Sequence, residues 1–371
     1  MPALRRHGFF VEVGPGAMRD RLRPHLAPAA ALLALVLLFL VLYRLRQSPA
    51  PVLPPAPPVS AASRLVRFTT PGAAEALALR GGPDAAVAQS IDAAERSVDM
   101  AMYELNLWSI RDALLRADER GVGVRLVMER DNMGAPEVEA LTAAGIPVVG
   151  DTDEGLMHDK FVVIDGAVVW TGSMNLTVSD AYYNDNNLIR LDDPDLASAY
   201  TAEFDEMFTD GRFGPLSPRG SGVHTADGRV EVAFSPDDGV AARLLALLPT
   251  ATTSLEVMAF SFTSDDLADA LLERAAAGVR VRVVLDEDQA RNLGSVYGRL
   301  RDAGLDVRLD GSPDKMHNKV MILDGETVVT GSYNFSRSAE VFNDENLVIL
   351  YDPEIAGAFE DEFERIFEAG K

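Results

Sequence analysis

Apolar runs of five or six residues alternate with longer amphipathic stretches along most of the chain. VDMAMY (98–103), VRLVME (124–129) and FVVID (161–165) have the length and composition of buried strands. SIRDALLRADERG (109–121) and SDDLADALLERAAAG (264–278) space apolar residues three and four apart and end at a glycine, which is typical of helices. This alternation predicts an α/β sandwich with mainly parallel sheets.

Two Asp-Gly pairs interrupt the apolar runs. Asp165-Gly166 and Asp324-Gly325 each lie between two strand-like segments. Because Asp-Gly is favoured in tight hairpin turns, part of each sheet should be antiparallel.

The chain contains an internal sequence repeat. MHDKFVVIDGAVVWTGSMNLT (157–177) and MHNKVMILDGETVVTGSYNFS (316–336) are identical at 10 of 21 positions. An offset of 159 residues relates these stretches, and it also relates later positions such as Asn187 and Asn346. A period this long indicates a duplicated domain instead of a solenoid.

The duplication sets the expected domain organisation. One copy should occupy residues 65–215 and the other residues 225–371, and residues 211–228 contain the link between them. Each copy has the size of an ordinary domain, so the chain can bury a large core.

The N-terminal part has a different composition. Residues 1–25 form a basic segment, and residues 26–43 (LAPAAALLALVLLFLVLY) contain no charge over eighteen positions. That length is the lower end of a membrane-spanning helix. More arginines precede the run than follow it, so we expect the N-terminus in the cytoplasm and the body outside the cell membrane. A Pro-rich, extended linker follows at 44–64.

A cleaved signal peptide is the alternative reading of this segment. Val59-Ser60-Ala61 resembles a cleavage site. The apolar run and the leader before it are both long for a signal peptide, which favours the single-pass anchor.

Charge and cysteine content narrow the function. The formal charge is −23; residues 1–59 carry +5, so the remaining residues carry −28. A body this acidic repels polyanions as a whole, which disfavours nucleic acid as a partner although a local basic site could still bind one. The chain has no cysteine, which excludes disulfides, thiolate nucleophiles and zinc sites that use cysteine.

Each repeat contains a His-x-Lys motif. His158 and Lys160, like His317 and Lys319, are two residues apart and therefore share one face of a strand. An imidazole can attack or transfer a proton near neutral pH, and an ammonium can hold an anion. The chain has four lysines against thirty arginines, yet two of the four stand here. This combination suits attack on a phosphodiester.

Asp165 and Asp324 follow the lysines by five residues and complete each motif. An odd spacing places the Asp side chain on the opposite face of an ideal strand. Two readings remain: the aspartates belong to the catalytic set, or they shape the hairpin and anchor a neighbouring segment.

Gly-Ser-x-Asn follows in both copies. Ser173, Asn175, Ser332 and Asn334 offer hydroxyl and amide groups for phosphate oxygens, and they could equally cap helices.

The repeats differ at one polar position. The 159-residue offset pairs Asn186 with Glu345. A carboxylate that accepts from histidine Nδ1 fixes its tautomer and raises its pKa, whereas an amide has less electrostatic effect. The two histidines therefore need not be equivalent.

Two copies of H-x-K-x4-D followed by G-S-x-N resemble the phospholipase D superfamily. The resemblance covers roughly residues 65–371 and implies a monomeric pseudo-dimer with one active site between its halves. It implies a route without metal or cofactor, in which His158 forms a phosphohistidine and His317 is the acid and base. It further implies that the lysines and asparagines hold the phosphoryl oxygens, and Asn186 departs from the acidic residue often found there.

Three functions compete. The first is a membrane-anchored phospholipase D-like hydrolase of phospholipid head groups, or a cardiolipin synthase-type transferase if the acceptor is a lipid alcohol. The second is a metal-independent nuclease of the same superfamily, which the compact halves favour. The third is a non-catalytic binding protein, which two intact motifs disfavour. No two histidines have metal-ligand spacing, so we predict no metal site.

Overall fold

The computed structural model describes residues 64–73, 76, 78–152, 154–216, 224–226 and 228–371. The predicted basic segment, membrane helix and most of the linker lie outside these residues. In the described part of the chain, no helix is both long enough and apolar enough to cross a membrane.

The first half contains a mixed sheet with strand order β1-β7-β6-β5-β2-β3-β4. Its strands are β1 (Arg64–Phe68), β2 (Ser97–Met102), β3 (Gly123–Met128), β4 (Val148–Gly150), β5 (Lys160–Ile164), β6 (Val168–Gly172) and β7 (Asn187–Asp192). Its helices are α3 (Pro83–Asp92), α4 (Trp108–Glu119), η1 (Arg130–Asn132), α5 (Pro136–Ala144), α6 (Val178–Tyr182), α7 (Pro194–Phe208) and η2 (Gly214–Leu216).

The second half repeats this plan with strand order β12-β11-β10-β13-β14-β15-β9-β8. Its strands are β8 (His224–Ala226), β9 (Val230–Ser235), β10 (Ser254–Ala259), β11 (Arg280–Leu285), β12 (Asp306–Leu309), β13 (Lys319–Leu323), β14 (Thr327–Gly331) and β15 (Glu345–Tyr351). Its helices are α8 (Val240–Leu247), η3 (Leu248–Thr250), α9 (Asp265–Ala276), α10 (Glu287–Ala290), α11 (Tyr297–Asp302), α12 (Arg337–Val341) and α13 (Pro353–Ala369).

The prediction of mainly parallel sheets is wrong. Only β2–β3 and β3–β4 are parallel among the described pairs of the first sheet, and β10–β11 and β11–β12 are their counterparts in the second. The predicted hairpins form at Asp165-Gly166 and Asp324-Gly325, where all four residues have positive φ angles. Antiparallel pairing continues from these hairpins to the edge of each sheet, so it exceeds the parallel part.

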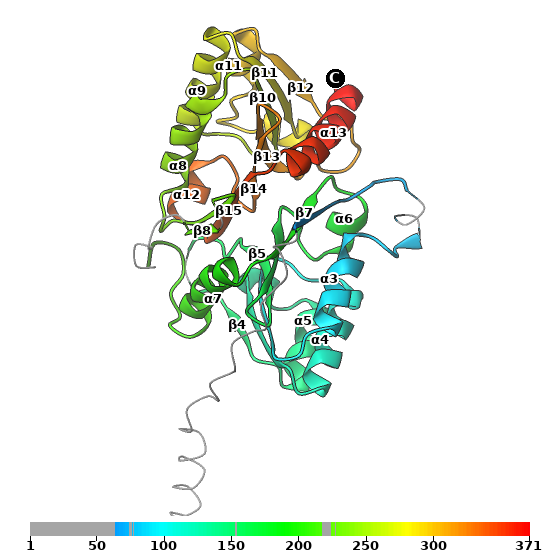
Figure 1. The fold of residues 1–371 in the computed structure, drawn as a ribbon. Helices are drawn as coiled ribbons and strands as arrows, with labels where there is room; N and C mark the ends of the chain where they lie inside the picture. Colours follow the sequence, from blue (N-terminus) through cyan, green and yellow to red (C-terminus); the bar gives the residue numbers. More distant parts are fainter. Residues whose placement is uncertain (1–63, 74–75, 77, 153, 217–223, 227) are drawn as a thin grey trace, which may run out of the picture. The chain divides into compact units, whose positions relative to one another are not determined.

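Helices cover the outer face of each sheet (Figure 1). α3, α4 and α5 pack on the first sheet, and α8, α9 and α11 pack on the second, each group forming its own apolar cluster. A third cluster draws residues from both halves, including the long helices α7 and α13.

Aromatic contacts join the halves within this shared cluster. Phe68 of β1 meets Phe359 of α13 with ring centroids 5.0 Å apart, and Tyr200 of α7 meets Phe234 of β9 at 5.1 Å. Tyr200 and Phe359 are separated by the repeat offset, so the two contacts are equivalent. The predicted intramolecular pseudo-dimer is therefore present, with a continuous core between its halves.

Candidate active site

Each His-x-Lys motif lies at the start of a central strand and is held by backbone from the opposite half. Met157 forms a parallel bridge with Asp344, and Met316 forms one with Asp185. His158 N donates to Asp344 O at 3.0 Å, and the equivalent bond of the second motif runs to Asp185 O at 2.9 Å. Neither motif is therefore positioned by its own half alone.

Buried asparagines add hydrogen bonds along the contact between the halves, which we call the seam. Asn346 Nδ2 donates to Asp159 Oδ1 at 2.7 Å, and Asn187 Nδ2 donates to Asn318 Oδ1 at 2.8 Å. Asp159 and Asn318 are the middle residues of the two His-x-Lys motifs. These bonds fix the backbone directly beside each catalytic candidate.

The two histidines exchange partners across the interface. His158 Nδ1 lies 2.7 Å from Glu345 Oε2, and His317 Nδ1 lies 2.9 Å from Asn186 Oδ1. Because a carboxylate only accepts hydrogen bonds when ionised, Glu345 selects the His158 tautomer with the proton on Nδ1. In both rings Nδ1 is engaged, which leaves Nε2 for chemistry.

Both lysines are buried and point back at their own motif. Lys160 Nζ donates to His158 O at 2.6 Å, and Lys319 Nζ donates to His317 O at 2.7 Å. Burial lowers the pKa of Lys160 to about 8 and that of Lys319 well below its usual range. A bound anion would favour the charged form of both amines, so two buried lysines within electrostatic reach of each other can form an anion site.

Burial also keeps the imidazoles neutral. It lowers the pKa of His158 to about 4, although the attraction of Glu345 opposes this effect. It lowers the pKa of His317 well below its usual range, and the charges of Lys319, Lys160 and His158 add to that. Since Lys160 and His158 belong to the first half, the two motifs lie within electrostatic reach of each other. A bound phosphate would offset these positive charges and favour the imidazolium form.

An aromatic ring lies beside each motif. The Tyr103 ring meets the His158 ring edge-on at 4.9 Å and lies 5.1 Å from Lys160 Nζ. Phe260 stands in the same place beside His317, at 4.7 Å. Sequence reasoning missed these rings, because a single aromatic residue at the end of a buried strand looks like core.

The serines of the two Gly-Ser-x-Asn stretches support the contact between the halves. Ser173 Oγ accepts from Asn187 N at 3.0 Å, and Ser332 Oγ accepts from Asn346 N at 3.0 Å, so both hydroxyls hold the seam. Ser173 also donates to the Asn186 oxygen that faces His317.

The two asparagines of this motif differ. Asn175 Nδ2 donates to Asp180 Oδ2 at 2.7 Å, and its own Oδ1 is buried without a partner in the described structure. Asn334 has Ala339 where Asn175 has Asp180, so no carboxylate restrains its amide in that way. The Oδ1 atom of Asn334, like that of Asn175, is buried without a partner in the described structure.

Asp165 and Asp324 stand apart from the histidines. Each lies in its hairpin turn with φ near +54° and accepts from three successive backbone N–H groups, those of residues 95–97 or 252–254. For Asp324, burial raises the pKa, and these backbone bonds outweigh it and hold the pKa well below its ordinary value. Of the two readings of these aspartates, these backbone bonds favour the structural one.

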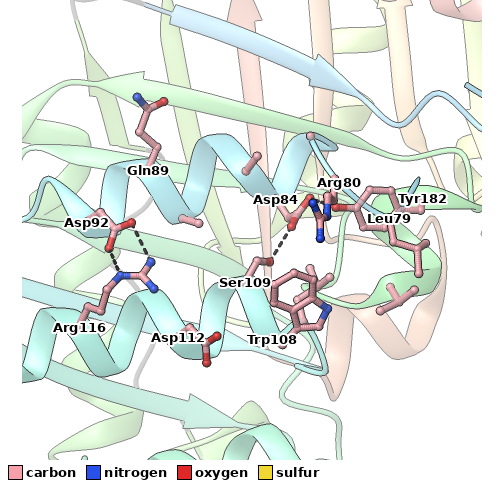
Figure 2. A pocket seen from close by; sticks show the side chains of 15 residues that line it. Leu79, Arg80, Asp84, Gln89, Asp92, Trp108, Ser109, Asp112, Arg116 and Tyr182 are labelled. Carbon is pink, nitrogen blue, oxygen red and sulfur yellow. Dashed lines mark hydrogen bonds and ion pairs between the residues drawn. The ribbon is translucent and has the colours of Figure 1, made fainter. Parts of the chain in front are cut away.

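The structure also has a cavity that is separate from the histidines. A cavity of about 400 Å³ between α3 and α4 is lined by Trp108 and by Asp84, which accepts from Ser109 and Tyr182 (Figure 2). None of the four motif residues lines it, so it is separate from the candidate active site.

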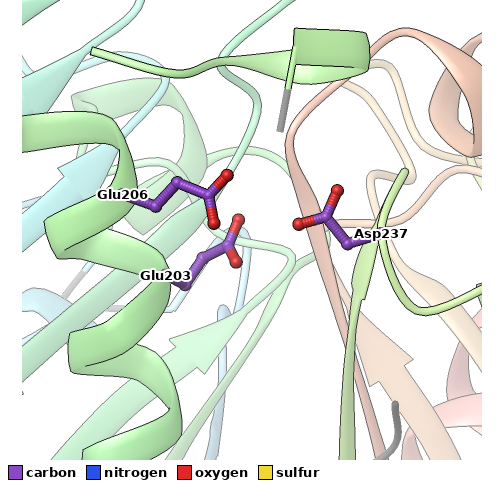
Figure 3. Close-up of side chains that lie close together, drawn as sticks. All are labelled: Glu203, Glu206 and Asp237. Carbon is purple, nitrogen blue, oxygen red and sulfur yellow. The ribbon is translucent and has the colours of Figure 1, made fainter. Parts of the chain in front are cut away.

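Three carboxylates from the two halves converge on one another. Glu203 and Glu206 of α7 approach Asp237, and one oxygen of each lies within 4.8 Å of the others (Figure 3). This group could hold a cation, and it could not be predicted from the sequence because the residues come from different halves. Carboxyl groups this close also retain protons: burial raises the pKa of Glu203 well above its usual range, and burial raises that of Asp237 to about 7.

Comparison with known proteins places this double site in a family. The sequence profile described as "Cardiolipin synthase, PLD-like domain" matches residues 87–208 and again residues 244–367. The chain belongs to the phospholipase D superfamily. The predicted resemblance is thereby confirmed for both halves.

Relatives within the superfamily match single stretches of the chain. The mitochondrial cardiolipin hydrolase of Chlamydomonas reinhardtii is 39% identical over 129 residues, which are 35% of this chain and 58% of that protein. A phospholipase D of Rickettsia bellii (strain RML369-C) is 31% identical over 131 residues, 35% of this chain and 65% of its own. The chain spans about three fifths of the length of the curated relatives it matches.

The whole two-sheet arrangement has a counterpart among solved structures. The phosphatidylserine synthase of Haemophilus influenzae Rd KW20 aligns with a TM-score of 0.62 over 82% of this chain and 87% of its own. At 15% sequence identity this likeness concerns the phospholipase D fold alone.

Proposed function

We propose that the protein is a phospholipase D-like phosphodiesterase that cleaves phospholipid head groups through a phosphohistidine. The observation that carries the proposal is the crossed bracing of His158 and His317. Each ring is tied through Nδ1 to a residue of the opposite half, and each stands beside a buried lysine.

The chemistry follows from the free ring nitrogens. His158 Nε2 attacks phosphorus, the bond from phosphorus to the leaving oxygen breaks, and His317 Nε2 donates a proton to that oxygen. His317 then takes a proton from water, the water oxygen attacks phosphorus, and the phosphorus–nitrogen bond breaks. Lys160 and Lys319 offset the charge on the phosphoryl oxygens throughout.

The asymmetry of the partners supports these roles. An ionised Glu345 beside His158 stabilises the positive charge that the ring carries as a phosphohistidine. Asn186 fixes the orientation of His317 without adding charge. His158 is therefore the better nucleophile, and His317 is the acid and base.

The lipid substrate is supported by several features together. Relatives over the matched stretch are named cardiolipin hydrolase and phospholipase D, and the described body is strongly acidic, which disfavours polyanionic nucleic acid. We also infer that residues 26–43 anchor the chain in a membrane, because eighteen uncharged residues suffice to span one. Resistance of the full chain to alkaline carbonate extraction would test the anchor, and release by carbonate would refute it.

The experiment offers the full chain in detergent three substrates in parallel, with EDTA present. These are cardiolipin, phosphatidylglycerol and single-stranded DNA. We expect lipid cleavage, and we expect His158→Ala and His317→Ala each to lower kcat by at least about 1,000-fold with the melting temperature retained. Cleavage of DNA but not lipid would make the protein a nuclease, and lipid-to-lipid transfer would make it a synthase.

The phosphohistidine has its own test. Rapid acid-free quenching of the enzyme with a slowly hydrolysed substrate should leave phosphorus on His158, identified by peptide mass spectrometry. Label on His317 alone would reverse the two roles, and activity that survives both alanine substitutions would end the assignment.

A further inference from the structure

The first half contacts His317 Nδ1 through the amide of Asn186, and it has a carboxylate, Asp180, six residues earlier. The repeat offset pairs Asn186 with Glu345 and also pairs Asp180 with Ala339. The first half thus has an amide at position 186 and an acid at position 180. The second half has an acid at the position equivalent to 186 and alanine at the position equivalent to 180. One acidic residue per half is retained, but at a different position.

Asp180 lies next to His317. Its Oδ2 atom is 3.7 Å from His317 Nδ1, and its side chain is buried in α6. In the described part of the chain, no other carboxylate comes within 4.0 Å of a ring nitrogen of this histidine. The contact crosses the interface, as the contact of Glu345 with His158 does.

The same asparagine position supports the carboxylate in both halves. Asn184 Nδ2 donates to Asp180 Oδ1 at 2.6 Å, and Asn343 Nδ2 donates to Glu345 Oε1 at 3.2 Å. Asn184 and Asn343 are related by the repeat offset. Although the acids come from different elements, each accepts a hydrogen bond from the asparagine at this position, which supports Asp180 as the counterpart of Glu345.

If His317 is the general acid, the positive charges that face it call for a negatively charged neighbour. Lys319 of β13, Lys160 of β5, His158 and the exposed Lys315 all disfavour the imidazolium, and the Asn186 amide is neutral. The Asp180 carboxylate, 3.7 Å from His317 Nδ1, is placed to oppose them. It shares this space with Glu104, whose pKa is raised by burial and by the Asp180 charge.

We propose that Asp180 is the positioning residue that supports the protonated form of His317, while Asn186 sets the direction of its Nδ1–H bond. This inference rests on the proposed function, in which His317 protonates the leaving oxygen. In this role Asp180 acts through the ring and not on the substrate.

A merely structural role would look different in kinetics. Asp180 also accepts from Asn175 N at 2.8 Å and from Asn175 Nδ2 at 2.7 Å, so it orders the turn after β6. Loss of that order would slow every substrate alike. Loss of acid catalysis would slow only those substrates whose leaving group needs a proton.

The experiment therefore compares two leaving groups in the full chain. Phosphatidylglycerol releases an alcohol that needs a proton, and bis(4-nitrophenyl) phosphate releases a phenolate that does not. We expect Asp180→Asn to lower kcat/KM about 10- to 100-fold for the lipid and less than about 3-fold for the aryl ester. Glu345→Gln is the matched control, because it weakens the nucleophile and should slow both substrates.

A double substitution provides a second test in case Asp180→Asn disturbs the turn. The double variant Asp180→Ala with Asn186→Glu copies the arrangement of Ala339 and Glu345 into the first half. It should recover lipid cleavage to within about 3-fold of the parent chain. Equal loss on both substrates, or no recovery by the double variant, would overturn the role of Asp180. A parent chain inactive on both substrates would instead refute the proposed function.

Discussion

Replacement of Lys160 by methionine should make the protein more stable and inactive. Lys160 is almost fully buried, and its ammonium donates to His158 O at 2.6 Å. Methionine has a similar length and no charge, so it fits the same space without a desolvation cost. The proposed phosphate site, however, loses one of its two lysines.

The size of the gain follows from the shifted ionisation. Burial lowers the pKa of Lys160 from 10.5 to about 8 even though Glu345, Asp180 and Asp159 oppose it. At about 1.4 kcal/mol per tenfold change in the protonation equilibrium, the folded state carries a charge that costs roughly 3 kcal/mol at pH 7. The lost hydrogen bond subtracts about 1 kcal/mol. A net gain of roughly 2 kcal/mol should raise the melting temperature by about 4 °C.

The pH dependence gives a second check on the reasoning. Below pH 8 the lysine is charged in both the folded and unfolded states, so the full cost is present. As pH rises from about 8 toward 10.5, the folded state loses its proton first, and the cost disappears. The advantage of Lys160→Met should therefore shrink between pH 7 and pH 10.

Differential scanning calorimetry at pH 7 and pH 10, with lipid cleavage measured alongside, tests both points. Lys371→Met is the control, because this lysine is largely exposed and should change the melting temperature little. A fall in melting temperature at pH 7, or a gain that does not depend on pH, would refute the argument. So would retained activity.

Two further substitutions test the structural residues. Asp324→Ala should cost roughly 2 to 4 kcal/mol in the free energy of unfolding, because three backbone N–H groups lose their acceptor and alanine must adopt a φ of 54°. Its kcat should equal that of the parent chain, with Glu326→Ala in the same turn as control, and a selective loss of kcat would return Asp324 to the catalytic set. Glu203→Gln should raise the melting temperature more at pH 8 than at pH 5, since a carboxyl with a raised pKa keeps its proton when folded and loses stability as pH rises above its unfolded pKa. Thermal melts in EDTA at both pH values measure this, and an equal change at each would contradict it.

The sequence was most informative where local chemistry decides the structure. The Asp-Gly hairpins, the strands and the repeat offset could be predicted, because turn residues and apolar runs act over a few positions. The odd spacing from Lys160 to Asp165 also indicated that the Asp side chain would point away from the lysine. Sheet direction was mispredicted, because strand order depends on contacts between distant segments.

Partners across the interface could not be predicted. The difference between Asn186 and Glu345 was visible in the sequence, but which histidine meets which residue depends on how the halves pack. Asp180 was missed because an acidic residue in a short polar helix looks like surface. Its equivalence to Ala339 under the repeat offset was a usable signal, since an acid lost at one position and gained six residues earlier suggests compensation.

The crossed bracing also means that counting motifs is a poor guide to competence in chains of this kind. A fragment ending at Phe208 would keep its His-x-Lys sequence intact and still lack Glu345, the backbone of Asp344 and the amide of Asn346. A substitution in one half should therefore abolish activity even when every motif residue of the other half is intact. A chain with a single copy of the motif would have to pair with a second chain before it could be active.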